Sequence, residues 1–184
     1  MKVLFIGDIV GRRARNYAQE KIVELKTKLK LDAIIVNVEN SAGGFGVTPS
    51  ICDDFFRVGA DVLTTGNHIW DKREIISYIT KNDRLLRPLN MIEGTPGLGM
   101  TTVDLDAGKI GVANIMTNLF MQKTDNVFDK IPDILENLKL KKNVDFSLVD
   151  IHGEASSEKM ALGNALDGKV PAVVGTHTHV PTAD

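Results

Sequence analysis

The chain of 184 residues has one cysteine and no long apolar run, and each shortage excludes a class of protein. A single cysteine, Cys52, rules out an internal disulfide and favours a reducing compartment. Cys52 lies on a predicted helix face, which indicates a buried structural thiol. The four-residue apolar run near the N-terminus is too short for a secretory signal. No stretch approaches the roughly 18 apolar residues of a membrane-spanning helix. We therefore expect a cytoplasmic protein with no membrane partner.

An excess of charge of one sign is also absent. Lysine and arginine number 22 against 24 aspartates and glutamates, and the formal net charge is −2. This balance predicts no extended nucleic-acid surface and leaves room only for a local basic patch. Hydrophobic residues make up 43% and charged residues 25%, as in ordinary globular proteins. The length predicts one domain over residues 1–184.

Predicted strands and helices alternate along most of the chain. Strands are expected at 2–8, 33–39, 61–68, 145–152 and 171–177, and helices over about 12–29, 49–58, 72–79, 128–140 and 156–166. Thr48 and Pro49 are typical of a helix start, and Asp71 with Glu74 has the spacing of a capping box. The middle reads as strands at 84–90, 100–106 and 109–115, the last two forming a hairpin. This order predicts an α/β sandwich with a largely parallel sheet.

Polar residues end five of these strands. They are Asp8, Glu39, Asn40, Asn67, His68, His152, His177 and His179, which include all four histidines. Right-handed crossovers bring the carboxyl ends of parallel strands to one edge of a sheet, where ligands of open α/β sheets bind. We therefore expect these side chains to converge on one site.

Carboxylate, amide and imidazole groups together predict a metal site with oxygen and nitrogen ligands. The absence of cysteine ligands argues against structural zinc and iron–sulfur clusters. Such a mixed set fits iron or manganese, with zinc as a further alternative. Eight candidates exceed the needs of one ion, so a binuclear centre is expected, and Glu39 on a central strand is the natural bridging ligand. Two ions about 3.5–4 Å apart suit phosphoester cleavage, because they bind phosphate and activate a bridging hydroxide.

Several of these residues also have a purely structural explanation. Asp8 could cap the next turn, Asn67 could form a turn, and His68 could be a core histidine. Glu39 and Asn40 could satisfy backbone donors in the glycine-rich loop that follows. That loop, SAGGFG, lacks the lysine of a P-loop and is interpreted as a flexible turn.

The argument for ligation is strongest at the segment THTH. Residues two apart on a strand face the same way, so His177 and His179 would present two imidazoles together. Arg12, Arg13 and Arg15 could contact a substrate phosphate, but at least two of them are expected to face solvent on the first helix. Five structural coincidences along one sheet edge are less plausible than one shared site.

The chain resembles the YmdB-like branch of the calcineurin-like metallophosphoesterases. The matching segments span nearly the whole chain: GDIVGRRAR, NVENSAGGFGVTP, GADVLTTGNHIWD, RPLNMIEGTPGLG, DIHGEASSEKMALG and VVGTHTHVPTAD. The elements GNH and GTHTH indicate the superfamily, and VENSAGGFG with DIHGEASSEK indicates the branch. The resemblance implies a sandwich of two β-sheets flanked by helices.

The resemblance also implies a binuclear centre, usually iron-containing in this branch. One ion would be held by Asp8, Glu39, Asn40 and His179, and the other by Glu39, Asn67, His152 and His177. His68 would be the general acid that protonates the leaving oxygen. The implied activity is hydrolysis of phosphodiesters, including 2′,3′-cyclic nucleotides, in bacterial regulation linked to RNA turnover. The expected partner is therefore a small phosphodiester or an RNA end.

The chain departs from family patterns at two places. Many superfamily members begin with D-x-H, whereas this chain has Asp8-Ile9-Val10, and the resemblance implies that Asn40 replaces the missing imidazole. Members of the branch usually continue for several dozen residues past the point equivalent to Asp184. We therefore expect the domain to lack strands of the second sheet and to expose apolar surface, which would favour a homo-oligomer. A non-catalytic regulatory module that retains the metals and a phosphomonoesterase or protein phosphatase remain alternative functions.

Overall fold

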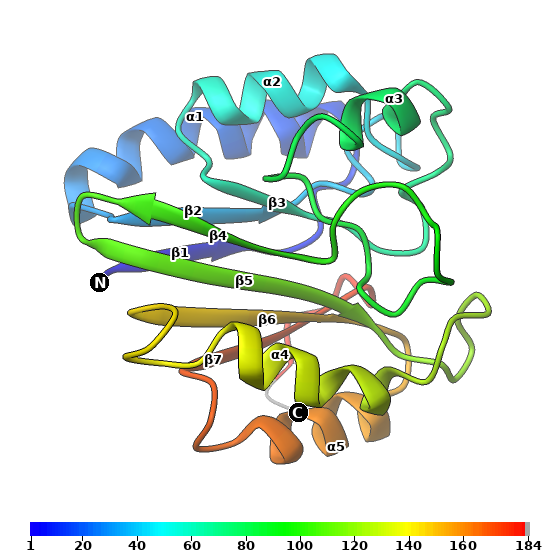
Figure 1. The fold of residues 1–184 in the computed structure, drawn as a ribbon. Helices are drawn as coiled ribbons and strands as arrows, with labels where there is room; N and C mark the ends of the chain where they lie inside the picture. The colour runs from blue at the N-terminus through cyan, green and yellow to red at the C-terminus, as the bar shows by residue number, and fades with distance from the viewer. Residues whose placement is uncertain (183–184) are drawn as a thin grey trace.

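Two β-sheets pack face to face between two layers of helices (Figure 1), in a computed structural model that describes residues 1–182. The first sheet has the order β1-β2-β3 and is parallel throughout. It comprises β1 (Val3–Ile6), β2 (Ala33–Asn37) and β3 (Val62–Thr64), with α1 (Gly11–Leu29), α2 (Pro49–Arg57) and α3 (Ile75–Ile79) on its outer face. The last two residues of the segment VVGTHTHVPTAD lie outside the described residues.

The second sheet has the order β4-β5-β6-β7 and is parallel except for the hairpin of its first two strands. Its elements are β4 (Met100–Leu105), β5 (Gly108–Met116), β6 (Phe146–His152) and β7 (Ala172–Thr176), covered by the 3₁₀ helix η1 (Val127–Lys130), α4 (Ile131–Asn137) and α5 (Ser156–Leu166). Because all parallel strands within a sheet run the same way, β5, β6 and β7 end at one edge.

Strand alternation divides the apolar side chains among three cores. In β2, Ile34 and Val36 pack toward the helices, whereas Ala33 and Ile35 pack toward the second sheet. Ile110 and Val112 of β5 complete that contact from the other side, in the core between the sheets. A strand buried on both faces must be apolar at consecutive positions, which explains the unbroken AIIV run in β2.

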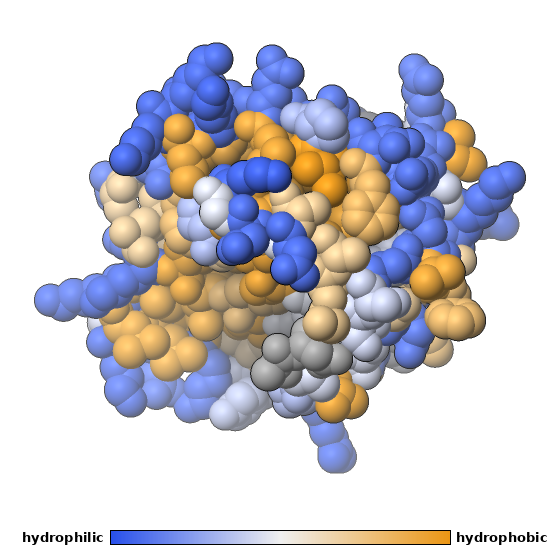
Figure 2. All heavy atoms as spheres, turned by 90° about the horizontal axis from the view of Figure 1, so that it is seen from below, coloured by the Kyte–Doolittle hydropathy of each residue, from blue (hydrophilic) through white to orange (hydrophobic). Residues whose placement is uncertain are grey.

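The face seen from below in Figure 2 is the side on which α4 and α5 lie, and apolar side chains gather there around a hollow. The edges of the two sheets also border an open groove of about 810 Å³ between β1 and β7. The groove is lined by apolar side chains such as Phe5 and Val174 and extends to Asp8 and His179. Among residues 1–182, no helix is both long enough and apolar enough to cross a bilayer.

The two-sheet sandwich that the resemblance implied is confirmed, whereas the expectation that all site residues meet on one sheet edge is wrong. Periodicity identifies strands but not their sheet, and the hairpin of β4 and β5 starts a second sheet instead of extending the first. The strand expected at 84–90 is also absent, and only single bridges form there, at Leu85 and Leu86.

Local helix signals were correct in two places and wrong in a third. The structure has α5 over the predicted residues, and the side chain of Thr48 accepts a hydrogen bond from the Ile51 amide at 3.4 Å, as a helix cap does. The prediction of a capping box at Asp71 and Glu74 is wrong. The helix begins only at Ile75, and no side chain caps it.

Candidate metal centre

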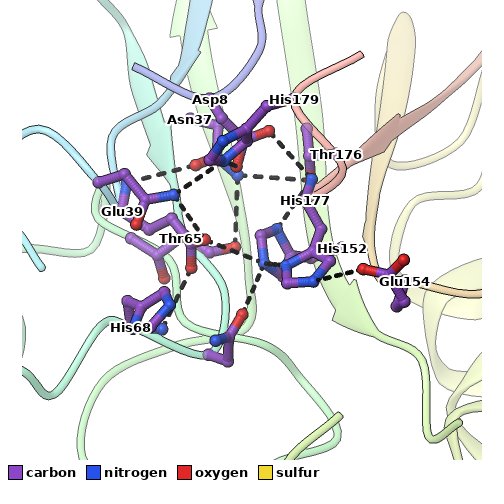
Figure 3. A network of polar contacts seen from close by, with 12 residues as sticks. Asp8, Asn37, Glu39, Thr65, His68, His152, Glu154, Thr176, His177 and His179 are labelled. Carbon is purple, nitrogen blue, oxygen red and sulfur yellow. Dashed lines mark hydrogen bonds and ion pairs between the residues drawn. The ribbon is translucent and has the colours of Figure 1, made fainter. Parts of the chain in front are cut away.

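The predicted site residues come together at the carboxyl ends of strands from both sheets (Figure 3). The first sheet contributes Asp8 after β1, Glu39 and Asn40 after β2, and Asn67 and His68 after β3; the second contributes His152 at the end of β6 and His177 and His179 after β7. Each sheet therefore holds part of the site, and the sandwich contact aligns the two parts.

Nε2 of His152 lies at the centre of a cluster of ligand atoms. It is 3.1 Å from Oε1 of Glu39, 3.0 Å from Oδ1 of Asn67 and 3.2 Å from Nδ1 of His177. Glu39 and His152 are fully buried. Ligand atoms of Glu39, His152 and His177 all lie within 4.8 Å of one another, the spacing of side chains that share a metal ion.

The electrostatics of this cluster favour a positive charge between its members. Burial lowers the pKa of His152, but the hydrogen bond and charge of Glu39 outweigh it and leave that pKa raised. Burial likewise opposes ionisation of Glu39, yet His152 keeps the pKa of Glu39 below its usual value. Burial and the neighbouring His152 lower the pKa of His177. A single proton on Nε2 of His152 cannot reach all three surrounding acceptor atoms, whereas a cation can, so these residues fit a metal ion.

A second group of potential ligands lies beside the first, and both groups contact the carboxylate of Glu39. Nε2 of His179 is 3.6 Å from Oδ1 of Asp8 and 3.2 Å from Nδ2 of Asn40, and that amide also contacts Oε1 of Glu39 at 3.0 Å. Within residues 1–182, Oδ1 of Asp8 and Oδ1 of Asn40 are buried without a hydrogen-bond partner. Two unpaired buried oxygens next to an imidazole also fit a cation.

The two histidines of the THTH segment do not share a strand face, so that prediction is wrong. The strand β7 ends at Thr176, and both histidines lie in the irregular segment beyond it. His177 has φ 99° and His179 has φ 57°, a backbone region that residues other than glycine rarely adopt. This conformation turns His177 toward His152 and His179 toward Asp8, so the two imidazoles serve different groups. Unusual backbone of this kind is concentrated at functional sites.

A buried polar network supports the site from below, between the two sheets. Oδ2 of Asp150 accepts hydrogen bonds from Thr64 at 2.5 Å and Asn37 at 3.2 Å, and Oδ1 accepts one from Thr176 at 2.7 Å. Burial raises the pKa of Asp150 to about 6, although these donors oppose the rise. Thr176 donates to Asp150 and can therefore accept from Nδ1 of His152 at 3.0 Å, which leaves Nε2 of His152 to face the cluster.

His68 is placed at the rim of the site with one ring nitrogen engaged. Its backbone amide donates to Oε2 of Glu39 at 3.2 Å, and its Nδ1 lies 2.8 Å from Oδ2 of Asp71. Among residues 1–182, nothing hydrogen-bonds to Nε2 of His68, which is therefore available to a substrate. The sequence assigned Asp71 to a helix cap and missed this contact. The three-residue spacing in HIWD was the available signal.

Glu154 is a second residue that sequence reasoning missed. Its carboxylate lies 3.1 Å from Nε2 of His177, and this contact directs Nδ1 of the same ring toward His152. The DIHGEASSEK segment thus contributes to the site beyond His152. Cys52 is buried as predicted, and burial raises the pKa of its thiol. Of the three arginines on α1, Arg15 donates to the Ser41 carbonyl at 3.0 Å.

Known proteins match this chain along its whole length. The family model described as "YmdB-like protein" matches residues 4–184. A Bacillus subtilis (strain 168) protein named 2′,3′-cyclic-nucleotide 2′-phosphodiesterase is 44% identical over 184 residues, which make up 100% of this chain and 69% of the relative.

Two solved structures share the fold. A hypothetical protein from Thermus thermophilus matches with a TM-score of 0.90 at 35% identity, over 100% of this chain and 70% of that one. A structure described as a novel phosphatase, from Mycoplasma pneumoniae, matches with a TM-score of 0.87 at 32% identity, over 100% of this chain and 66% of that one. The chain therefore spans about two thirds of the length of these relatives.

Proposed function

Because the chain belongs to the YmdB-like family, we propose that it hydrolyses phosphodiesters at a binuclear metal centre, with 2′,3′-cyclic nucleotides among its substrates. The observation that carries the proposal is the cluster around Nε2 of His152, where three acceptor atoms surround one ring nitrogen at 3.0–3.2 Å. The activity itself is the one named for the Bacillus subtilis relative.

We assign the ligands according to the two groups of residues that share Glu39. Glu39, Asn67, His152 and His177 would hold one ion, and Asp8, Glu39, Asn40 and His179 the other. Rotating the Asn40 amide by half a turn exchanges Nδ2 and Oδ1, which would direct its unpaired oxygen toward Glu39 and His179. Mixed oxygen and nitrogen ligands fit iron first, with manganese or zinc as alternatives.

When bound, two such ions would polarise the phosphate and supply the attacking hydroxide. The protein's own contribution to the reaction is proton transfer by His68. Asp71 holds Nδ1 of His68, so the protonated ring presents Nε2–H outward, where it can donate to the departing ribose oxygen. His68 is tied by its backbone to Glu39, which keeps this donor beside the proposed bridging ligand.

The proposal is tested by measuring metal content and turnover in the wild type and in His68→Ala. We expect about two ions per chain in protein purified without added metal. His68→Ala should retain the ions and lose turnover on 2′,3′-cyclic AMP by about 10²–10⁴-fold, the usual contribution of general acid catalysis. Asn67→Ala is the matched variant that should lose metal first.

Three outcomes would contradict the proposal. If the wild type binds no metal although all eight residues are intact, a binuclear centre is excluded. A metal-loaded wild type that cleaves phosphomonoesters and leaves phosphodiesters untouched would instead support the phosphatase alternative. A loaded protein without any hydrolase activity would support the regulatory module.

A further inference from the structure

One large aromatic side chain projects from the glycine-rich loop beside the site. Phe45 is 59% exposed, and its ring forms a T-shaped pair with the imidazole of His68, with ring centroids 4.9 Å apart and an interplanar angle of 61°. The interpretation of SAGGFG as a flexible turn gave this residue no role.

The loop that carries Phe45 is fixed at its base. The Ala42 amide donates to the Gly46 carbonyl at 2.9 Å, and the Gly44 amide donates to the Asn40 carbonyl at 3.2 Å. Gly43, Gly44 and Gly46 all have positive φ, so glycine at these positions permits a tight turn with Phe45 at its tip.

The loop also packs against the turn that holds His68. A Cβ atom at Gly46 would lie 2.9 Å from Cγ of Lys72 and 3.2 Å from Cβ of Asp71, so the two backbones are in close contact. Phe45 is therefore connected on one side to Asn40, a proposed ligand, and on the other to Asp71, the partner of His68. The backbone that carries Phe45 is therefore fixed on both sides, while the ring itself stays exposed to a ligand.

We propose that Phe45 stacks on the nucleobase of a nucleotide substrate and so makes the enzyme prefer nucleoside phosphodiesters over diesters without a base. This inference rests on the proposed function, in which His68 faces the leaving oxygen. That oxygen belongs to the ribose, and the base is attached to the same ring, so a base can reach a platform that borders His68. Stacking on an aromatic face accepts every base, which predicts a broad specificity with larger bases favoured.

The test compares 2′,3′-cyclic AMP with glycerol 1,2-cyclic phosphate, which carries the same strained diester without ribose or base. In the metal-loaded protein, Phe45→Ala should lower kcat/KM for 2′,3′-cyclic AMP by about tenfold or more, the range that stacking of one base is worth. It should leave kcat/KM for glycerol 1,2-cyclic phosphate within about twofold. Phe45→Trp should retain the preference, because it keeps an aromatic face.

Tyr17→Ala is the matched control, since Tyr17 is a similarly exposed aromatic on α1. Affinity for 3′-AMP against glycerol 2-phosphate, measured by calorimetry in the same variants, tests stacking without turnover. We expect Phe45→Ala to weaken binding of 3′-AMP and to leave binding of glycerol 2-phosphate unchanged.

Three results would overturn the inference. Equal losses on both diesters would mean that Phe45 only orients His68. No loss on either would make Phe45 an ordinary surface residue. A wild type with no preference between the two diesters would leave the proposed hydrolysis intact and reject base stacking. If the wild type cleaves neither diester, the proposed function fails, and the 3′-AMP affinities alone decide whether Phe45 binds a base.

Discussion

At the scale of single residues, the two histidines nearest the first proposed ion are held by different partners through different nitrogens. Nδ1 of His152 is bonded to Thr176, and Nε2 of His177 is bonded to Glu154. In each ring the other nitrogen then faces the cluster. Partners of this kind fix the tautomer of a ligand histidine and raise its basicity, so they govern metal affinity although they touch no metal.

We therefore predict that Glu154→Ala weakens metal binding while leaving the fold intact. Loss of an outer partner of a ligand histidine typically lowers metal affinity by about 10–100-fold. Glu154 is half-exposed, so its removal leaves no buried cavity. Competition with a chelator of known affinity measures the effect, and Glu154→Gln should retain part of the affinity because its amide oxygen can still accept from Nε2.

Glu20→Ala, which removes an exposed carboxylate from α1, is the control for a general loss of negative charge. Equal metal affinity in Glu154→Ala and the wild type would show that the contact with His177 is incidental.

Residue types alone indicated the site but not the partners of its members. All eight candidates lie at or just beyond strand ends, as predicted, but these strands belong to two sheets and not to one. Asp71 was assigned to a helix cap, since its spacing to Glu74 fits that pattern equally well. The contact of Asp71 with His68 depends on a turn whose shape the local sequence pattern does not determine. Glu154 was missed because it follows the strand by two residues and has no periodic signal.

At the scale of elements, the end of β3 must approach two other elements closely. A Cβ atom at Gly66 would overlap the imidazole of His152, and it would lie 2.5 Å from Oε2 of Glu39. The strand thus needs glycine just before Asn67 so that residues from β2, β3 and β6 can meet.

We predict that Gly66→Ala abolishes high-affinity metal binding, because the added methyl group displaces the imidazole of His152 or the carboxylate of Glu39. Metal content after dialysis checks this. Gly163→Ala is the matched control: Gly163 lies within α5 with nothing within 4 Å of an added Cβ, so it should stabilise the fold by about 0.5–1 kcal/mol and leave metal content unchanged. Normal metal content in Gly66→Ala would show that the elements can separate without losing the site.

The segment after β7 shows where element prediction reached its limit. Alternation along a strand predicts a shared face for His177 and His179, and that rule fails once the chain leaves the strand at Thr176. Positive φ at both histidines of the motif depends on contacts with Asp8 and His152, which belong to distant parts of the chain. Local propensity contains no information about such contacts.

At the scale of the whole molecule, the site connects two sheets, each built from its own set of hydrogen-bonded strands. Polar side chains also cross the interface beneath it: Asn37 of β2 donates to Asp150 of β6, and Asn114 of β5 accepts from the Thr65 amide at 3.2 Å. The sequence contained a sign of this arrangement. Inner-face positions change from apolar to polar toward the strand ends, as from Ile35 to Asn37 and from Leu148 to Asp150. Which strands share a sheet remained undetermined, because it depends on pairing between distant segments.

Since ligands from both sheets would share the ions, we predict that metal binding stabilises the entire fold. An ion present at 100 times its dissociation constant adds about 2.7 kcal/mol to the free energy of unfolding when it binds only the folded state. For a chain of this size that corresponds to a rise in Tm of roughly 5–10 °C. Thermal unfolding of the loaded protein, before and after chelation and on readdition of manganese, measures the shift.

His177→Ala should remove most of this shift, because it deletes a ligand supplied by the second sheet, whereas Tyr17→Ala should preserve it. The stabilisation should also appear in hydrogen exchange of both β2 and β6, since a cation held between Glu39 and His152 opposes separation of the sheets. If chelation removes the metal and changes the hydrogen exchange of only one of these strands, the ions are held by a single sheet. In that case the distances between Glu39 and His152 reflect packing of the sandwich and not a shared ligand site.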